Sequence, residues 1–131
     1  MSATLHAVAI VVPDYEAGLE FYVGRLGFDL VEDTDMGGGK RWVLIQPSGG
    51  GTQLLLARAV NDEQRAAIGR QTGGRVGFFL NTGDFDADHA RMLAAGVEFE
   101  ETPRDEPYGR VAVFRDPFGN RWDLLQLVAR P

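Results

Sequence analysis

The chain has 131 residues, no cysteine and a formal net charge of −6 at pH 7, and 44% of its residues are hydrophobic, enough for the core of one globular domain. The missing cysteines exclude disulfides, thiolate metal ligands and cysteine nucleophiles, and the acidic balance, without a basic stripe, argues against a nucleic-acid partner. The apolar run near the N-terminus follows no basic segment and is too short for a signal peptide or a membrane span. We therefore expect a cytoplasmic protein with no membrane partner.

The first half of the chain predicts one helix and four strands. The strands are expected at residues 5–12, 28–33, 41–46 and 53–57. Asp14 can cap the helix that follows the first strand, and Gly27 ends it. A glycine-rich loop at 36–39 joins the second and third strands, so this half has the order βαβββ.

The second half predicts the same order after a short connecting helix within residues 61–72. Strands are expected at residues 75–81, 97–101, 110–114 and 121–127. Asp84 or Asp86 begins the helix between the first two of them. The loop 102–108 contains two prolines and an aromatic residue followed by glycine, and its part from Arg104 to Tyr108 is either a lid over a site or an ordinary acidic surface loop.

The two halves also match residue by residue. The hairpin GKRWVLIQPSGGGTQLLLA (39–57) aligns with GRVAVFRDPFGNRWDLLQL (109–127) at an offset of 70 residues, with Val43 on Val113 and Pro47 on Pro117. A unit of about 60 residues buries too little apolar surface to be comfortably stable alone. We therefore predict a single domain over residues 1–131, built from module 1 (about 5–59), the linker helix (about 61–72) and module 2 (about 75–128).

Three sequence features resemble one protein family. They are Phe21-Tyr22 inside the first helix, Leu26-Gly27-Phe28 after it, and the turn at 116–120, DPFGN, before the last strand. Together with the tandem βαβββ order, they resemble the vicinal-oxygen-chelate (VOC) superfamily, which includes glyoxalase I, extradiol dioxygenases and the bleomycin-resistance proteins. The resemblance covers essentially the whole chain.

The resemblance implies an α+β fold in which two tandem βαβββ modules form a cupped mixed β-sheet around a cavity. It also implies homodimers, with modules that pair either within one chain or with a partner. Enzymes of the family usually hold one divalent metal through His and Glu side chains on the first and last strands of each module. That metal polarises two adjacent substrate oxygens.

This sequence lacks such ligands at the matching positions. Alignment on Asp14 and Asp84 puts Ala7 and Gly77 on the first strands, and alignment of the hairpins puts Gln53 and Asp123 on the last strands. One amide and one carboxylate are a poor set for a tight metal site. We therefore expect no metal cofactor.

A shift in register keeps an alternative open. His6 lies one residue from the ligand position, and a slip of one residue in a strand turns a side chain to the opposite face. A bulge before Asp14 would allow one divalent metal ion to bind through His6 and Asp123. Arg75 replaces Gly77 at the matching position if Thr82-Gly83 is an insertion.

Several other residues are candidates for a binding site. Gln53 and Asp123 can offer an amide and a carboxylate to a small polar ligand, and Asp123 can act as a general base if burial raises its pKa, or else pair with Arg41 or Arg121. Arginines on the strands can attract an anionic ligand, and aromatic residues can line an apolar pocket. These further substrate-binding candidates are Arg41, Trp42, Tyr108, Arg110 and Phe114.

Two function classes follow from these patterns. The first is a metal-free binding protein, similar to the bleomycin-resistance group, that holds a cationic, planar or amphipathic small molecule in the β-cup. The second is a metal-dependent glyoxalase-like lyase or isomerase, or a dioxygenase, acting on a vicinal-oxygen substrate with Asp123 as the catalytic candidate. The missing ligands favour the first class.

Overall fold

A computed structural model describes residues 1–128 of the chain, so the last three residues of the expected domain lie outside the described part. The chain divides into two compact units, unit 1 over Met1–Ile68 and unit 2 beginning at Gly69. Their boundary falls between the expected modules, after the linker helix. The expectation of a single domain stays a prediction.

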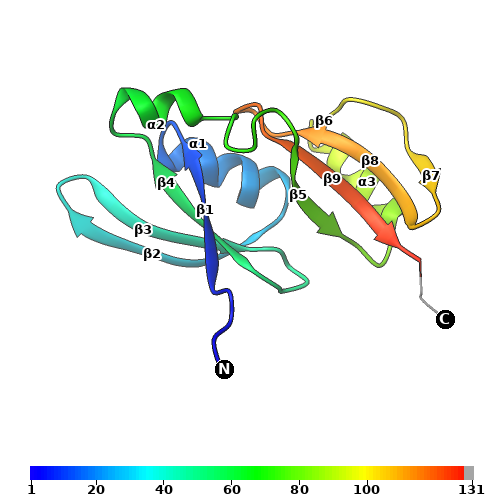
Figure 1. Ribbon diagram of the computed structural model, residues 1–131, viewed down its shortest axis with the longest axis horizontal. Helices are drawn as coiled ribbons and strands as arrows, with labels where there is room; N and C mark the ends of the chain where they lie inside the picture. Colours follow the sequence, from blue (N-terminus) through cyan, green and yellow to red (C-terminus); the bar gives the residue numbers. More distant parts are fainter. Residues whose placement is uncertain (129–131) are drawn as a thin grey trace. The chain divides into compact units, whose positions relative to one another are not determined.

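Unit 1 contains a four-stranded mixed sheet in the order β1-β4-β3-β2 (Figure 1). β1 pairs with β4 in parallel orientation. β3 pairs with β4 on one side and with β2 on the other, and both of these pairs are antiparallel. The strands are β1 (Ala7–Val12), β2 (Asp29–Gly37), β3 (Lys40–Gln46) and β4 (Gln53–Arg58). These are the four strands expected from the sequence, with ends that differ by a few residues.

The first helix follows β1 and changes its pitch midway. Asp14 caps α1 (Tyr15–Leu19) by accepting a hydrogen bond from the Ala17 amide at 2.7 Å, as predicted. The chain then continues as a π-helix, η1 (Glu20–Arg25), rather than as the single α-helix expected. The wider turn accompanies a pair of consecutive buried aromatic side chains, Phe21 and Tyr22, which pack edge to face at 5.1 Å.

The core of unit 1 lies between α1 and one face of the sheet. Ile10, Val12 and Val43 are fully buried there. A Cβ on Gly18 would lie 2.9 Å from Leu56, so glycine allows the helix to approach the sheet this closely. The connecting helix α2 (Asp62–Ala67) follows β4, and Asn61 caps it by accepting from the Gln64 amide at 2.8 Å.

Unit 2 contains a mixed sheet in the order β5-β9-β8-β6, with a fifth strand, β7, also paired to β8. β5 is parallel to β9, and the other pairs are antiparallel. The strands are β5 (Val76–Asn81), β6 (Glu98–Phe99), β7 (Arg104–Glu106), β8 (Gly109–Arg115) and β9 (Arg121–Leu127). Figure 1 shows α3 (Phe85–Ala94) covering one face of this sheet.

The segment expected to form a lid is instead part of the sheet edge. β6 and β7 both pair with β8, and the residues between them, 100–103, form a break in an otherwise continuous edge. The Glu100 amide donates to the Val113 carbonyl at 2.9 Å, and the Glu101 carboxylate accepts from the Val113 amide at 2.8 Å. Because backbone pairing holds Arg104–Glu106, we correct the lid prediction for this stretch.

An aromatic stack fills the core beneath α3. Phe78 and Phe114 both stack on Trp122, at centroid distances of 4.6 and 5.7 Å. Phe99 contacts Phe114 at 5.6 Å and His89 at 4.5 Å. His89 is thus a half-buried packing residue of α3.

The turn between β8 and β9 is organised by one buried carboxylate. Asp116 is 4% exposed and accepts hydrogen bonds from the amides of Phe118 and Asn120 and from the side chains of Asn120 and Trp122, at 2.8–3.1 Å. Gly119, with φ of 104°, adopts a backbone that favours glycine. The DPFGN motif is therefore a structural turn that anchors Trp122 in the core.

Overall, the α+β architecture predicted from the sequence is confirmed, with one four-stranded and one five-stranded sheet. Among residues 1–128, no helix is both long enough and apolar enough to cross a membrane.

We predict that Asp116→Ala lowers the free energy of unfolding by about 3 kcal/mol or more, because four buried donors lose their charged acceptor. Urea denaturation checks this. Asp29→Ala, at a fully exposed position on β2, is the control and should change stability by less than about 0.5 kcal/mol. Equal effects of the two substitutions would contradict the role given to Asp116.

Candidate functional site

Each strand of unit 2 presents alternate side chains to opposite faces of the sheet. Trp122 and Phe114 are cross-strand partners on the face covered by α3. Asp123 pairs with Val113 on β8 and with Phe79 on β5, so these three side chains share the other face. We call this second face the open face of unit 2.

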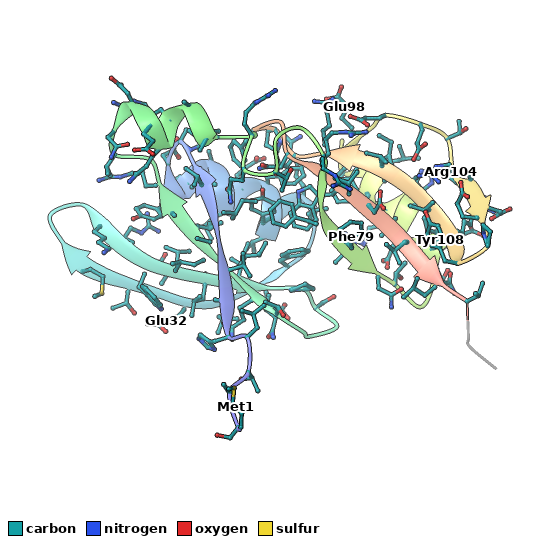
Figure 2. The ribbon with its side chains drawn as sticks, in the orientation of Figure 1. Met1, Glu32, Phe79, Glu98, Arg104 and Tyr108 are labelled. Carbon is teal, nitrogen blue, oxygen red and sulfur yellow. The ribbon has the colours of Figure 1, made fainter. Side chains whose placement is uncertain are left out.

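On the open face one carboxylate lies among apolar side chains, and we call this group of residues, Val111, Val113, Leu125 and Asp123, the trough. Val111, Val113 and Leu125 are all at most 6% exposed. Asp123 lies among them and is 8% exposed, whereas its neighbour Phe79 is 66% exposed at the sheet edge (Figure 2). Asp123 Oδ1 is fully buried and has no hydrogen-bond partner. Leaving a carboxylate oxygen in this state costs free energy unless a proton or a ligand satisfies it.

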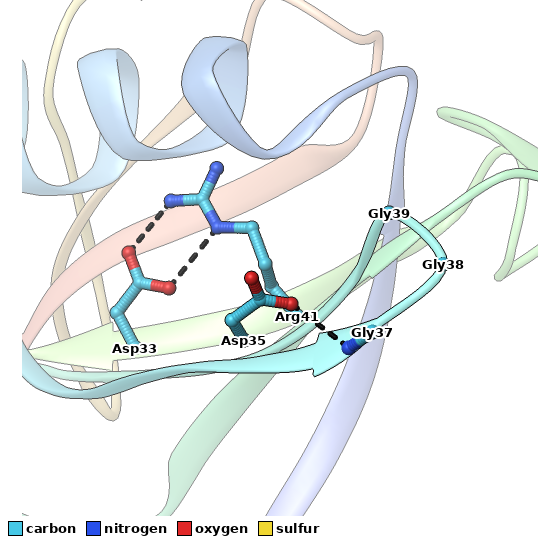
Figure 3. A pocket seen from close by; sticks show the side chains of 6 residues that line it. All are labelled: Asp33, Asp35, Gly37, Gly38, Gly39 and Arg41. Atoms are coloured by element: carbon cyan, nitrogen blue, oxygen red, sulfur yellow. Dashed lines mark hydrogen bonds and ion pairs between the residues drawn. The ribbon is translucent and has the colours of Figure 1, made fainter.

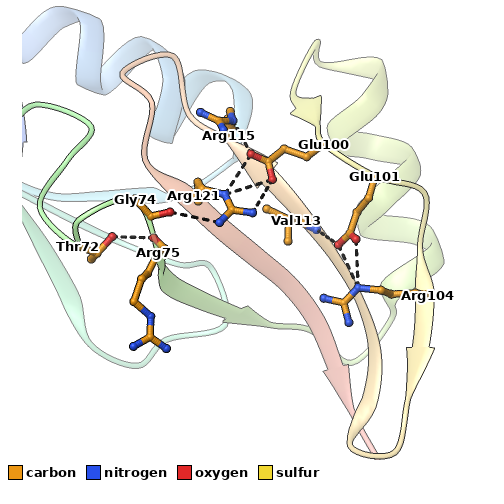
Figure 4. Close-up of polar contacts among 9 residues, drawn as sticks. All are labelled: Thr72, Gly74, Arg75, Glu100, Glu101, Arg104, Val113, Arg115 and Arg121. Carbon is orange, nitrogen blue, oxygen red and sulfur yellow. Dashed lines mark hydrogen bonds and ion pairs between the residues drawn. The ribbon is translucent and has the colours of Figure 1, made fainter.

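The arginines nearest to Asp123 are committed to other carboxylates (Figure 4). Arg104 bonds Glu101 at 3.1 Å and Glu106 at 2.6 Å, and it also has a hydrogen bond to the Tyr108 side chain. Arg121 bonds Glu100 at 2.8 Å, and Glu100 is bonded by Arg115 as well. These contacts hold the pKa of Arg104 above its usual value and that of Glu100 below its usual value. Neither arginine forms an ion pair with Asp123 in the part of the chain that the structure describes.

The protonation of Asp123 reflects this environment. Burial raises the pKa of the Asp123 carboxyl, because the charged form loses water. The positive charges of Arg104 and Arg121 oppose the rise, and the negative charge of Glu101 adds to it. Among the described acidic side chains with a resolved shift, Asp33 and Glu100 shift in the opposite direction because each binds an arginine directly. Asp123 is thus suited to donate, accept or exchange a proton.

The matching residue of unit 1 has a similar defect. Gln53 lies beside Ala7 at the start of β4, and its Oε1 is buried without a partner. Strand alternation and the pairing of Leu44 with Leu55 put these two leucines, Gln53 and Trp42 on the face opposite α1. Trp42 is half-buried. This face of unit 1 therefore carries an unsatisfied amide oxygen and, further along the sheet, an aromatic ring.

Arg41 lies on the α1 side of unit 1 instead. It bonds Asp33 in bidentate fashion, at 2.6 and 3.1 Å, and Glu16 at 2.6 Å, which holds the pKa of Arg41 above its usual value. Its guanidinium also lies 5.1 Å from the centre of the Tyr15 ring. Figure 3 shows Arg41 and Asp33 at the β2–β3 turn, where Asp35 accepts from the Gly37 amide. These residues line a polar hollow of about 420 Å³.

The remaining candidates are divided between the faces and the edge of unit 2. Phe114 is fully buried in the stack beneath α3. Arg110 bonds Asp105 and Asp86, and its guanidinium lies 5.6 Å from the Phe85 ring centre, on the α3 side. Tyr108 is 46% exposed at the β7 edge, near Arg104. Of the predicted residues in this unit, Asp123 and Tyr108 are therefore those nearest to the trough.

The offset of 70 residues fails in two strands. Phe79, not Gly77, lies beside Asp123, because β5 is irregular between Val76 and Phe78, and the alternative residue Arg75 precedes the strand. Val43 packs toward α1 with Leu56, whereas its supposed match Val113 lies on the open face. The turn at 47–52 is one residue longer than the turn at 116–120, and a slip of one residue reverses the face.

The strand pairing puts Ala7 beside Gln53 in unit 1 and Phe79 beside Asp123 in unit 2, and these are the residues to compare with the four metal ligands that the family resemblance implies. Two of these side chains have no donor atom, so the set does not fit the four-ligand metal centre. His6 is exposed and precedes β1, and its carbonyl accepts from the Gln53 amide at 3.3 Å. Within residues 1–128, no three His, Asp or Glu side chains are grouped closely enough to hold a metal ion.

Sequence reasoning missed three residues that shape the trough: Phe79, Glu101 and Arg104. Phe79 was hidden by the bulge in β5. Glu101 and Arg104 were assigned to a loop because three consecutive charged residues, 104–106, show no strand alternation; Pro107 and Gly109 were the signal for a tight turn between two strands.

We predict that Asp123→Asn raises the melting temperature at neutral pH by a few °C, because it removes a buried charge that lacks a counter-ion. The raised pKa means that the folded state favours the protonated carboxyl, so the contribution of Asp123 to stability is greatest in acid and is lost as pH rises through its folded-state pKa. The advantage of the variant should therefore shrink as pH falls toward the ordinary pKa of aspartate. Melting curves across a pH series check this, and a pH-independent difference would contradict it.

The chain matches the family model described as Glyoxalase/Bleomycin resistance protein/Dioxygenase superfamily over residues 4–124. It is 50% identical over 129 residues to an uncharacterized protein of Shewanella frigidimarina (strain NCIMB 400), covering 97% of this chain and 96% of that one. Among solved structures, UcmS2 is 30% identical with a TM-score of 0.81, and 95% of this chain and 98% of UcmS2 are covered.

A second solved structure is TnmS3, described as an antibiotic binding protein from Streptomyces sp. CB03234. It is 34% identical with a TM-score of 0.78, covering 98% of this chain and 99% of that one. The family match spans both units and agrees with the tandem βαβββ order and the DPFGN turn. The chain therefore belongs to the Glyoxalase/Bleomycin resistance protein/Dioxygenase superfamily.

Proposed function

We propose that this protein is a metal-free binding protein that holds a small, cationic and largely apolar molecule in the trough of unit 2. The observation that carries the proposal is Asp123, a buried carboxylate with an oxygen that no group in the described structure satisfies. A protonated amine of a ligand would supply both the hydrogen bond and the missing positive charge.

The surroundings of Asp123 support this ligand class. Val111, Val113 and Leu125 offer an apolar floor, and the exposed ring of Phe79 offers a surface for aromatic packing at the sheet edge. Glutamates neutralise the neighbouring arginines, so the cluster of Asp123, Arg104 and the two glutamates bonded to Arg104 carries an excess of negative charge. Such a site attracts cations and repels anions.

The family relationship supports binding of an organic molecule. TnmS3 is described as an antibiotic binding protein, and this chain is similar to it over nearly its full length. The donor set at the metal-ligand positions includes two side chains that cannot coordinate, which favours binding over metal-dependent lyase, isomerase or dioxygenase chemistry. We also propose a cytoplasmic location.

Titration with 9-aminoacridine, a planar aromatic cation at neutral pH, and with acridine, its neutral analogue, tests the proposal. We expect the cation to bind more tightly than the neutral analogue to the unmodified protein. Asp123→Asn should weaken binding of the cation by about tenfold or more, because a charge-assisted hydrogen bond is lost. Binding of the neutral analogue should change much less.

Asp105→Asn is the matched control, because Asp105 is an exposed carboxylate of the same unit that bonds Arg110 at 3.3 Å. It should leave the affinity for the cation within about twofold. Failure of both probes to bind, or equal affinities in the unmodified and Asp123→Asn proteins, would overturn the proposal.

Elemental analysis of purified protein, with melting curves before and after a chelator, tests the proposed absence of a metal cofactor. We expect no stoichiometric metal and no shift in melting temperature on adding zinc, nickel, manganese or iron(II). A stoichiometric metal or a clear rise would contradict the metal-free assignment. His6→Ala would then show whether His6 is a ligand.

We also propose that the protein is a homodimer. Every residue of β2 is exposed, including Leu30, Val31 and Met36, which are 47–56% exposed, and this strand forms an edge of its sheet. Sedimentation analysis should give twice the monomer mass of 14.3 kDa. A monomer at micromolar concentration would contradict the proposal.

A further inference from the structure

We propose that Glu101 is the specificity-determining residue of the trough, because it holds Arg104 away from Asp123 and thereby keeps the carboxylate available to a cationic ligand. This inference rests on the proposed function for its biological meaning. Its structural part concerns contacts among residues of unit 2 and can be tested without a ligand.

Arg104 is placed where it could neutralise Asp123. It pairs with Val111 in the β7–β8 ladder, and Val111 lies two residues from Val113, the cross-strand partner of Asp123. Figure 4 shows the guanidinium of Arg104 extending from β7 across β8. Its positive charge already acts on the Asp123 carboxyl. An arginine side chain in this place would ordinarily be expected to bond the nearby buried carboxylate.

Glu101 competes for that arginine from a fixed position. One of its oxygens accepts from the Val113 amide at 2.8 Å, and the carboxylate receives Arg104 Nε at 3.1 and 3.3 Å. The backbone anchor exists only because the edge strand is broken between β6 and β7, which leaves the Val113 amide free of a strand partner there. The break therefore positions an acidic side chain beside the trough.

Glu106 shares Arg104 but not this anchor. It bonds Arg104 Nη1 at 2.6 Å from within β7 itself, whereas the Val113 amide donates to Glu101. Arg121, on the other side of Asp123, is held by Glu100 and by a bond to the Gly74 carbonyl at 3.2 Å. Release of Arg104 from Glu101 is thus the simplest change that would give Asp123 an internal cation.

Glu101→Gln tests the inference, because glutamine can still accept from the Val113 amide while losing the charge that holds Arg104. The readout is a double-mutant cycle between Arg104→Met and Asp123→Asn, measured by urea denaturation. In the unmodified background, we expect the two substitutions to be coupled by less than about twofold in the unfolding equilibrium constant. In the Glu101→Gln background, the coupling should rise to about fivefold or more.

Glu106→Gln is the matched control, since it also removes a carboxylate partner of Arg104. It should leave the coupling below about twofold, and an increase equal to that of Glu101→Gln would overturn the assignment to Glu101. A coupling of fivefold or more in the unmodified protein would overturn the inference without any Glu101 variant. That measurement keeps the test decisive even if Glu101→Gln fails to fold.

Probe binding distinguishes failure of this inference from failure of the proposed function. Glu101→Gln should weaken binding of 9-aminoacridine by about tenfold and leave acridine within about twofold, because the released guanidinium competes with the cation alone. A large rise in coupling without this loss would support the contacts and overturn the role in specificity. Loss of both probes equally would also overturn that role.

Discussion

The burial of Asp123 without a hydrogen-bond partner for Oδ1 is the constraint on which the open face of unit 2 depends. A carboxylate in an apolar trough is costly, and its raised pKa expresses that cost. The surrounding charges are arranged so that the cost is not relieved. Arg104 and Arg121 both lie near enough to influence Asp123, and each is bonded to glutamates instead.

This arrangement follows from the way the sheet edge is built. Backbone pairing holds β7 against β8, while the break at residues 100–103 lets Glu101 fold back onto Val113. Two of the acidic residues that bond the arginines, Glu100 and Glu101, therefore come from the irregular part of the edge, whereas Glu106 and the arginines come from regular strands. A regular strand through this region would satisfy the Val113 amide with backbone and leave Glu101 without its anchor.

Unit 1 also buries a polar acceptor on the face opposite its helix, with different chemistry. Gln53, which the sequence aligns with Asp123, lies beside Ala7 at the start of β4, and its Oε1 has no partner among the described residues. An amide carries no charge, so its burial costs less and needs no counter-ion. The hydrogen-bonded arginine of this unit, Arg41, is on the opposite face with Asp33 and Glu16. The duplicated scaffold thus presents one neutral and one acidic acceptor.

The sequence by itself determined the α+β class, the two βαβββ modules, the helix caps at Asp14 and Asp84, and the family. These follow from local periodicity, turn chemistry and the internal repeat, which act within short stretches of chain. It also pointed to Gln53 and Asp123, through the alignment of the two hairpins at an offset of 70 residues. Whether these two residues bind a ligand stays a prediction.

The tertiary structure alone decided which residues surround Asp123. An irregularity in β5 brings Phe79 beside it. The β8–β9 turn is one residue shorter than the β3–β4 turn, so Val113 shares the face of Asp123, whereas Val43, its sequence match, packs toward α1. Pairing of β7 with β8 places Arg104 near the trough, where the sequence suggested a lid. Face and register depend on single-residue slips and on long-range pairing, and neither leaves a clear signal in the local pattern of one sequence.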